Sequence, residues 1–447
     1  MLRIIHTTLN LCSLGITLAK LKFSKNVSTR LSQQLVNAIM RCGAVTIKFG
    51  QWFAMKQDVN SIETRPLYLE LQKTLENCPE HSIRHTRKLF KKSFGKDIDE
   101  VIQLRGEHPI ASGSVGQVYR GLMGETEVIV KVMHPHIHVD YFVTSFFLRI
   151  LGNIFFGCVD IEEFLKNVKL QYDYNNEANN LKIMYDFYKD DKVIIIPKLI
   201  MHSKTIIVMT YEDGIDYSEI AQDVLKQKVA LSILSFQRQN SAIHGYIHGD
   251  LHDGNWKVRV NNGNDFNLVI YDFGLVNQVD PVVMAEWSKA FQYQDYETLV
   301  NLALSHSEGT YDTEILEEII SNCKNLIHPK SGMLKTLKVI IPMMRRYNIR
   351  MKDGFLSTLV SFALTENILS NLDRGTICVD TNNGYVSNCL DIIAFCESRD
   401  TCRLLQKQLE DEIETTPLTR MFTRSESIID SFNLDDFYND TMSSELS

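Results

Sequence analysis

No run of about 18 or more apolar residues occurs in this 447-residue sequence, so no segment is expected to span a bilayer unaided. The nine cysteines include no Cys-x-x-Cys pair, which argues against a disulfide framework or a zinc site and favours a reduced, non-secreted protein. A formal net charge of −8 gives no reason to expect nucleic acid as a partner. With 44% hydrophobic and 23% charged residues, the composition is that of a globular protein with two or three structural units.

Acidic residues are missing from the first 57 positions, which contain eight lysines or arginines and an apolar stretch at residues 9–21. For residues 1–35 this pattern leaves three alternatives open: a targeting peptide, which would favour mitochondria, a helix on a membrane surface, or a helix docked on the rest of a cytoplasmic protein. The end of the chain has the opposite character, with six acidic and no basic residues after Arg424. We expect residues 411–447 to form a disordered acidic tail.

The spacing of apolar residues predicts an α+β fold with three parts between these ends. Residues 36–100 have helical spacing and are expected to form a helical extension. Alternating and β-branched runs predict a small lobe at residues 101–215, with a turn at 121–124, strands at 194–197 and 206–209, and a helical insert at 140–190. Residues 216–410 are expected to form a mainly helical lobe, interrupted by loops and short strands near 247–275.

An ordered series of residues is typical of a site for a nucleotide triphosphate and its metal ions. The series consists of Lys131 in a short apolar run, Glu177, the tripeptide His248-Gly249-Asp250, Asn255, and the tripeptide Asp272-Phe273-Gly274. Each element alone is a weak signal, but the set stands in the order and spacing found in protein kinases. The sequence therefore predicts a bilobal kinase-type ATP site with the nucleotide between the lobes.

Each member of the series has a physical role in phosphoryl transfer. Lys131 offers a cation to the phosphates, and Glu177 is the carboxylate expected to hold its long side chain in place. Asp250 is predicted to be the catalytic base. Asn255 and Asp272 supply the hard oxygen ligands that Mg²⁺ prefers. In the alternative interpretation, Glu177 is one acid on a solvated helix.

A loop of small residues precedes Lys131 by 15–20 positions, where a phosphate-binding loop is expected. Small residues allow backbone N–H groups to approach phosphate closely, although a tight hairpin turn would explain the same pattern. The predicted nucleotide contacts of the loop are Ala111, Ser112, Gly113, Ser114, Val115 and Gly116. Met209 and Tyr211, at the end of the 206–209 strand, complete the predicted set.

Two histidine patterns raise the question of a metal site. His134, His136 and His138 alternate, but an exposed segment after a strand is the simpler interpretation. The second pattern, with a spacing of four, consists of His244, His248 and His252. The irregular catalytic loop expected there would keep these residues from sharing one helix face. We expect neither to bind zinc.

Two elements of ordinary protein kinases are absent from the sequence. Gly249 replaces the arginine that receives an activation-loop phosphate, and no Ala-Pro-Glu follows the Asp272 tripeptide, after which residues 283–304 have a helical pattern. Without the segment that forms a peptide-substrate platform, a protein substrate is disfavoured.

These departures and the helical extension resemble the UbiB/aarF-domain-containing atypical kinases over roughly residues 40–375. The most specific mark is Lys48-Phe49-Gly50-Gln51, which matches the family's K-x-G-Q signature. The alanine-rich loop of the family is similar to residues 111–117, its V-A-V-K-V-x-x-P to residues 128–135, and its L-D-[FY]-x-x-E-A-x-N to residues 172–180. The H-A-D-P-H-P-G-N motif is similar to residues 248–255, and E-G-x-x-x-x-L-D to the stretch from Thr365 to Asp373.

The resemblance implies an extended kinase-like fold whose K-x-G-Q helices pack over the substrate site, with Lys48 and Gln51 reaching into it and Lys48 competing for Glu177. It also implies Mg-nucleotide binding and a role as an ATPase or lipid-directed kinase in ubiquinone or other isoprenoid-lipid pathways. Ser112 and Gly113 stand where the family has alanines, and we expect this change to favour ATP over ADP. Leu251 and Asp253 replace two prolines and Asn367 a glycine, but no catalytic group is lost.

Three functions remain in competition at this point. The first is an atypical ATP-dependent kinase or ATPase that acts on an isoprenoid lipid or quinone-pathway intermediate at a membrane surface. The second is a nucleotide-gated lipid-binding protein whose ATP turnover is incidental. The third is a small-molecule phosphotransferase of the aminoglycoside or choline kinase type, which the K-x-G-Q element disfavours. Neither the phosphate acceptor nor the oligomeric state follows from the sequence.

Overall fold

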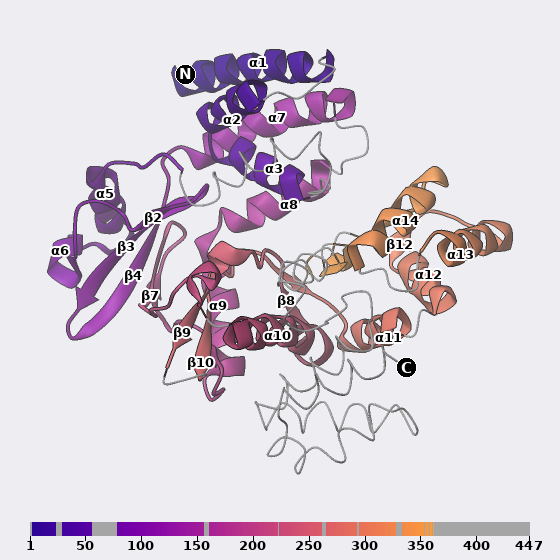
Figure 1. Ribbon diagram of the computed structural model, residues 1–447. Coiled ribbons are helices and arrows are strands. Elements are labelled where there is room, and N and C mark those ends of the chain that lie inside the picture. Colours follow the sequence, from indigo (N-terminus) through magenta and orange to yellow (C-terminus); the bar gives the residue numbers. More distant parts are fainter. Residues whose placement is uncertain are drawn as a thin grey trace, which may run out of the picture. The chain divides into compact units, whose positions relative to one another are not determined.

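A computed structural model describes residues 2–23, 29–55, 78–155, 161–221, 223–261, 265–292, 295–327 and 333–352, with 354–356, 358–359 and 361. The chain forms two compact units (Figure 1). The first consists of residues 1–187, 196–212 and 271–275, and the second of residues 188–195, 213–270 and 276–447. Residues 56–77 of the predicted helical extension and the predicted acidic tail lie outside the described residues.

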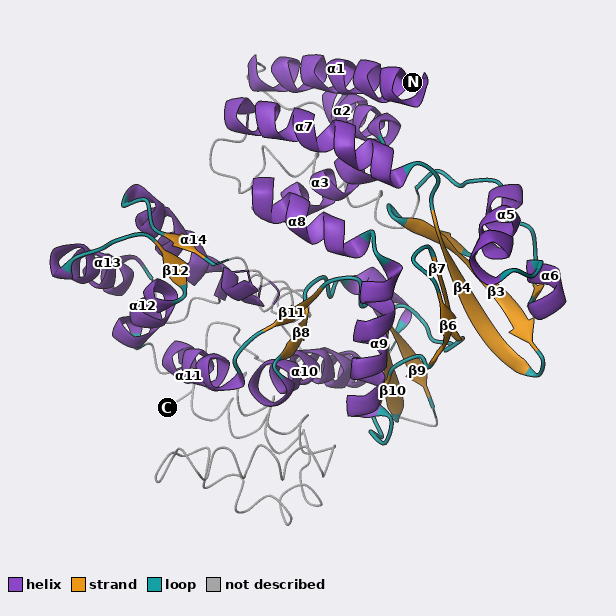
Figure 2. Cartoon of the chain, turned by 180° about the vertical axis from the view of Figure 1, so that it is seen from behind, coloured by secondary structure: helices purple, strands orange, loops and turns teal. Residues whose placement is uncertain are grey.

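An antiparallel sheet with the strand order β1-β3-β4-β7-β6 forms the centre of the first unit, and β2 pairs with β3. The strands are β1 (Gln103–Leu104), β2 (Ala111–Ser112), β3 (Gly116–Met123), β4 (Thr126–Met133), β6 (Leu199–His202) and β7 (Ile206–Thr210). Two helices, α5 (Ile83–Phe94) and α6 (Ile98–Val101), pack their apolar residues against valines and isoleucines of this sheet (Figure 2). In this sheet β4, which carries Lys131, lies between β3 and β7.

Helices make up the rest of the first unit. They are α1 (Leu2–Phe23), α2 (Thr29–Cys42), α3 (Ala44–Met55), α7 (Ile137–Phe155), α8 (Ile161–Gln171) and α9 (Tyr174–Tyr188). In both views α1 lies along α2 and α7 (Figures 1 and 2), and Leu11 and Leu14 of α1 are buried with Leu35 of α2 and Val143 of α7. The N-terminal segment is therefore a helix docked on the fold of this unit. None of the described helices is long and apolar enough to cross a membrane.

The second unit is mainly helical and contains three small sheets. Its sheets pair β5 (Ile194–Ile195) with β10 (Phe266–Ile270) and β9 (Trp256–Val260), β8 (Tyr246–His248) with β11 (Val276–Gln278), and β12 (Ser307–Glu308) with β13 (Arg350–Met351). Its longer helices are α10 (Asp223–Gln239), α11 (Pro281–Gln292), α12 (Tyr296–Ser305), α13 (Thr313–Leu326) and α14 (Met333–Arg346). Short helical turns occupy Tyr217–Glu219, Asn240–His244 and Asp253–Asn255. A core around Trp287, Leu299, Ile319 and Ile340 holds the last four helices together.

Several predicted elements are confirmed, and others need correction. Strands β3 and β4 surround Lys131 as expected, but β3 continues to Met123, so the predicted turn at 121–124 shrinks to Gly124 and Glu125. The 194–197 strand is only two residues long, because Pro197 cannot donate to a ladder, and β6 was not predicted. The helical pattern at 283–304 corresponds to two helices, since Asp295 caps a new helix with its carboxylate on the Thr298 N–H.

Candidate nucleotide and catalytic site

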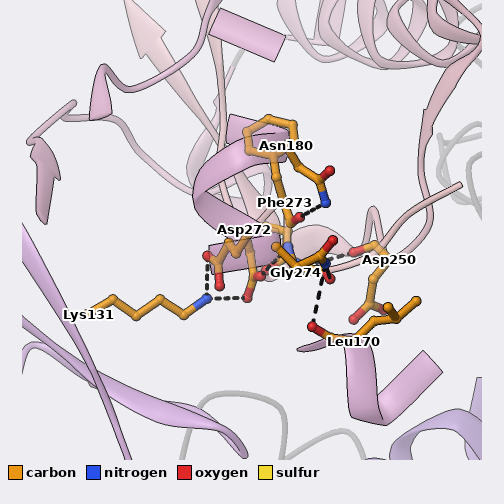
Figure 3. A network of polar contacts seen from close by, with 10 residues as sticks. Lys131, Leu170, Asn180, Asp250, Asp272, Phe273 and Gly274 are labelled. Atoms are coloured by element: carbon orange, nitrogen blue, oxygen red, sulfur yellow. Dashed lines mark hydrogen bonds and ion pairs between the residues drawn. The ribbon is translucent and has the colours of Figure 1, made fainter. Parts of the chain in front are cut away.

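Lys131 lies at the centre of a buried ionic cluster in the first unit. Its Nζ is 2.7 Å from Glu177 Oε1 and 3.1 Å from Asp272 Oδ2, and a dashed line in Figure 3 marks the contact with Asp272. The side chains of Lys131 and Glu177 are only 11% and 4% exposed, whereas Asp272 is 45% exposed. The predicted pairing of Lys131 with Glu177 is therefore present, and the more accessible carboxylate is that of Asp272.

The charges in this cluster are unbalanced, because one ammonium serves two carboxylates. Burial opposes the charge on Lys131, but Asp272 and Glu177 outweigh it and raise the lysine's pKa. Burial raises the pKa of Glu177 to about 7, with Lys131 acting to lower it and Asp272 acting to raise it further. A cation that took over Asp272 would therefore free Lys131 to neutralise Glu177 alone.

Helix α9 positions the Asp272 tripeptide through three residues on one face. Asn176 Nδ2 donates to the Gly274 carbonyl at 3.1 Å. Asn180 Nδ2 donates to the Phe273 carbonyl at 2.9 Å, the bond drawn between these two residues in Figure 3. Glu177, between them on the same face, reaches Asp272 through Lys131. The helix thus fixes both the lysine and the backbone of the tripeptide.

Backbone geometry also singles out Asp272. Its φ of 54° lies in the left-handed region that non-glycine residues seldom occupy. The Gly274 N–H donates to Asp272 Oδ1 at 3.3 Å, and a Cβ on Gly274 would lie 3.1 Å from that oxygen. Glycine at 274 therefore leaves room for the folded-back carboxylate, which explains why the third position of the tripeptide is small.

The carbonyl groups of the predicted phosphate loop accept hydrogen bonds from within the protein. Carbonyls of four loop residues accept N–H groups of the protein: Ser112 from Cys78 N at 2.8 Å, Gly113 from the His134 ring at 2.9 Å, Val115 from His134 N at 3.0 Å and Gly116 from Gly113 N at 3.0 Å. The N–H groups of Ser114 and Val115 donate no hydrogen bond within the described chain. This arrangement leaves the amides of Ser114 and Val115, two of the six residues predicted to contact nucleotide, available to an anion, whereas the Gly113 N–H is used by the Gly116 carbonyl.

Gly116 is required by close packing. A Cβ at this position would lie 2.5 Å from the Val132 carbonyl oxygen and 2.3 Å from the Tyr174 hydroxyl. The loop is therefore pressed against β4 next to Lys131, whose Nζ lies 5.4 Å from the centre of the Tyr174 ring. The segment is also the hairpin turn of the alternative interpretation, because β2 and β3 pair antiparallel and the Gly113 N–H donates to the Gly116 carbonyl.

Met209 and Tyr211 stand at the end of β7, but much of Tyr211 is already engaged. Its N–H donates to the Glu127 carbonyl at 2.9 Å, and its ring lies 3.8 Å beneath the Arg120 guanidinium. Met209 is buried in the sheet opposite Ile129. A nucleotide contact at Tyr211 would therefore have to use atoms other than its N–H.

The K-x-G-Q element lies on α3. Lys48 is half-buried and close enough to Glu177 to act on that carboxylate, although burial and Lys131 have larger effects on the pKa of Glu177. Lys48 also opposes the effect of burial, which raises the pKa of the Cys78 thiol to about 11. The predicted proximity of Lys48 and Glu177 is thus found. Gln51 belongs to the same helix, but its side chain lies outside the described atoms.

The predicted catalytic loop belongs to the second unit and is held by its own hydrogen bonds. Its first residue, His248, is fully buried and accepts the Asp250 N–H at Nδ1 at 3.2 Å. Asn255 Nδ2 donates to the Asp250 carbonyl at 2.7 Å, and Ser361 Oγ donates to the Gly249 carbonyl at 3.2 Å. Since the Asn255 nitrogen is used internally, its Oδ1 is the atom suited to a metal ion.

The histidine patterns have different outcomes. The second is confirmed as irregular: its members lie in the turn Asn240–His244, in β8 and before the turn Asp253–Asn255. The interpretation of His134 as part of an exposed segment is wrong, because its ring turns inward onto Gly113 and onto His81. In the part of the chain that the structure describes, no three or more His, Cys, Asp or Glu side chains gather as metal ligands.

Comparison with known proteins agrees with this geometry. Residues 73–302 match the model of the ABC1 atypical kinase-like domain, and this match spans just over half of the chain. The chain belongs to the ABC1 atypical kinase-like family. The α+β kinase-like fold predicted from the sequence and the resemblance to the aarF-type kinases are thereby confirmed.

Individual known proteins are only distantly similar to this chain. The chain is 30% identical over 253 residues to a probable serine/threonine-protein kinase of Dictyostelium discoideum, covering 53% of this chain and 36% of the relative. It is 25% identical over 286 residues to a chloroplastic activity-of-BC1-complex kinase of Arabidopsis thaliana, covering 60% and 37%. A Mycobacterium tuberculosis protein solved with erythromycin aligns with a TM-score of 0.45 at 15% identity, over 66% of this chain and 83% of that one. The chain thus spans little more than a third of the length of the Dictyostelium and Arabidopsis relatives.

Four residues of this ABC1 site were not predicted: Asn176, Asn180, His81 and His134. A signal for the two asparagines existed, since positions 176, 177 and 180 share a helix face. His81 and His134 lie 53 positions apart, and no local pattern links them. The charged groups of the site were predicted from the sequence, and the side chains that position them were not.

Proposed function

We propose that this chain binds Mg-nucleotide and transfers or hydrolyses its terminal phosphate. The observation that carries the proposal is Lys131, a buried cation held at 2.7 Å by Glu177 beside an accessible carboxylate, Asp272. The loop of residues 111–116 leads into β3, the strand next to the one that carries Lys131, and the N–H groups that it offers to phosphate are those of Ser114 and Val115.

Each unit contains an oxygen donor of the kind that magnesium prefers. Asp272 offers a half-exposed carboxylate, and Asn255 an amide oxygen whose nitrogen is already bound. Hard oxygen ligands of this kind bind Mg²⁺ together with phosphates, and the ion would supply charge neutralisation at the phosphate that is transferred. Lys131 then orients the inner phosphates, and Asp250 accepts the proton of the attacking hydroxyl or water.

Replacing Asp250 with asparagine tests this function. We expect Asp250→Asn to bind Mg-ATP within about threefold of the wild type but to lower turnover by at least about a hundredfold, because general base catalysis contributes about that much. The measurements are calorimetric binding of Mg-ATP and Mg-ADP and release of inorganic phosphate. Asp265→Asn, also in the second unit, is the control. If wild-type protein binds neither nucleotide, the proposed function is wrong. If Asp250→Asn keeps full turnover, the assignment of Asp250 as the catalytic base is wrong.

We also propose that the chain works at an anionic membrane surface, with an isoprenoid lipid or quinone-pathway intermediate as phosphate acceptor or ligand. Support comes from two exposed apolar stripes at helical spacing. On α7, Phe142, Phe146 and Ile150 are 75%, 62% and 48% exposed. On α1, Leu9 and Ile16 are 65% and 60% exposed within the segment that lacks acidic residues. Apolar side chains combined with an excess of positive charge suit a surface of anionic lipids.

Vesicle binding tests this proposal. We expect the wild type to sediment with vesicles of phosphatidylcholine and phosphatidylglycerol, and the double variant Phe142→Ser/Phe146→Ser to sediment at least about fivefold less, because each phenylalanine contributes roughly 1.5–3 kcal/mol when buried. Leu326→Ser, at an exposed leucine of α13 in the second unit, is the control. Equal sedimentation of all three proteins would contradict the proposal. Phosphate release that does not change with vesicles would favour the alternative of a nucleotide-gated lipid-binding protein.

A further inference from the structure

Behind the phosphate loop, a hydrogen-bonded pair of histidines connects α5 to the loop. His81 Nδ1 lies 2.8 Å from His134 Nδ1, and His134 Nε2 lies 2.9 Å from the Gly113 carbonyl oxygen. On the other side, His81 Nε2 is 3.1 Å from the hydroxyl of Thr86, which is itself 3.1 Å from that of Tyr119. A row of contacts thus runs from the core of the first unit to a single loop carbonyl.

The backbone of His81 is also fixed. Gln117, which is fully buried on β3, accepts the His81 N–H at 2.9 Å and donates to the His81 carbonyl at 3.0 Å. This pair of bonds holds the segment before α5 against β3 as another strand would. The backbone of His81 is therefore placed by the sheet that carries the loop, and its ring cannot move without breaking the hydrogen bonds to His134 and Thr86.

The protonation of the two rings determines which ring donates each hydrogen bond. Burial lowers the pKa of His81 to about 3 and also lowers that of His134, so both rings are neutral near pH 7. A carbonyl only accepts, so His134 must carry its proton on Nε2. Its Nδ1 then accepts, and His81 must donate from Nδ1. Each ring thus fixes the tautomer of the next.

The consequence for the loop follows from the planarity of the peptide bond. The Gly113 carbonyl and the Ser114 N–H belong to one peptide and point in opposite directions. When the His134 ring holds the carbonyl, the Ser114 N–H must face the other way. His134 N bonds to the Val115 carbonyl in addition, so one residue fixes two of the loop's peptides.

We propose that His81 and His134 are positioning residues that hold the phosphate loop with the Ser114 N–H turned toward a bound phosphate. Neither ring touches the nucleotide. His81 sets the tautomer of His134, and His134 sets the orientation of the peptide between Gly113 and Ser114. This inference rests on the proposed nucleotide binding and names the residues that set its phosphate affinity.

Two matched substitutions of His134 test the inference. In His134→Gln the side-chain amide reaches the position of Nε2 and keeps a donor for Gly113, whereas in His134→Asn the amide reaches only the position of Nδ1. We expect His134→Asn to bind Mg-ATP about tenfold more weakly and His134→Gln to stay within about threefold, since only the glutamine amide still holds the Gly113 carbonyl and with it the orientation of the Ser114 N–H. Binding of adenosine, which has no phosphate, should be unchanged in both.

A second variant and a control complete the experiment. His81→Phe removes the donor to His134 and should weaken Mg-ATP about fivefold, again without affecting adenosine, and it serves if His134→Asn does not fold. His108→Asn, at an exposed histidine of the same unit, should bind as the wild type does. Equal Mg-ATP affinity in His134→Asn and His134→Gln, or equal losses for Mg-ATP and adenosine, would overturn the inference. Wild-type protein that binds no nucleotide would instead refute the proposed function.

Discussion

Lys131→Met is expected to abolish phosphate release and to lower the free energy of unfolding by about 3 kcal/mol, at the low end of the cost of breaking a buried ion pair. Activity is lost because no other cation of this cluster orients the inner phosphates. Stability falls because Glu177, 4% exposed, loses its 2.7 Å partner. The cost stays at the low end because burial raises the pKa of Glu177 to about 7, so the carboxyl can take up a proton when the lysine is gone.

The double variant Lys131→Met/Glu177→Gln separates the two effects. It removes the buried charge together with its partner, so most of the stability should return while phosphate release stays absent. Urea unfolding and phosphate release measure the two quantities. Lys257→Met is the control, since its pair with Asp216 is 38% and 51% exposed and contributes less than about 1 kcal/mol. If the double variant is no more stable than Lys131→Met, the two side chains do not form an energetic pair.

The sequence predicted the charged residues of the site because their chemistry restricts the residue type. A buried lysine needs a carboxylate, so Lys131 indicated Glu177 before any geometry was available, and the order of motifs indicated Asp272. The strand that carries Lys131 was predictable because the lysine stands in a short apolar run, which is typical of a buried strand. In the structure this strand pairs with a neighbouring strand on each side.

The positioning residues could not be predicted in this way, because hydrogen bonds to backbone carbonyls leave no pattern in the sequence. Many donors can hold the Gly113 carbonyl, so His134 carries no signal of its role. The exposed interpretation of His134 failed for this reason. The predicted end of β3 was wrong for a different reason. The strand continues through Gly121, where a Cβ would lie 2.7 Å from an Ile102 methyl, so this glycine is needed for close packing and not for a turn.

Asp272→Asn is expected to weaken Mg-ATP binding by at least about tenfold, or roughly 1.4 kcal/mol, and to have the opposite effect on ATP without magnesium. In the wild type, Asp272 holds the Lys131 ammonium at 3.1 Å and competes with phosphate for it. An uncharged asparagine binds Mg²⁺ less well but releases this competition. The same change removes a carboxylate that acts to raise the pKa of Glu177, so the remaining lysine–glutamate pair should become stronger.

Calorimetry with excess magnesium and with a chelator measures the two affinities, and Asp216→Asn, at an exposed ion pair in the second unit, is the matched control. A metal-binding role for Asp272 requires the two conditions to give different signs. If Asp272→Asn weakened binding equally with and without magnesium, the residue would contact the nucleotide directly or support the loop. If both affinities equalled those of the wild type, Asp272 would lie outside the nucleotide site, and the proposed magnesium site would lose its carboxylate ligand.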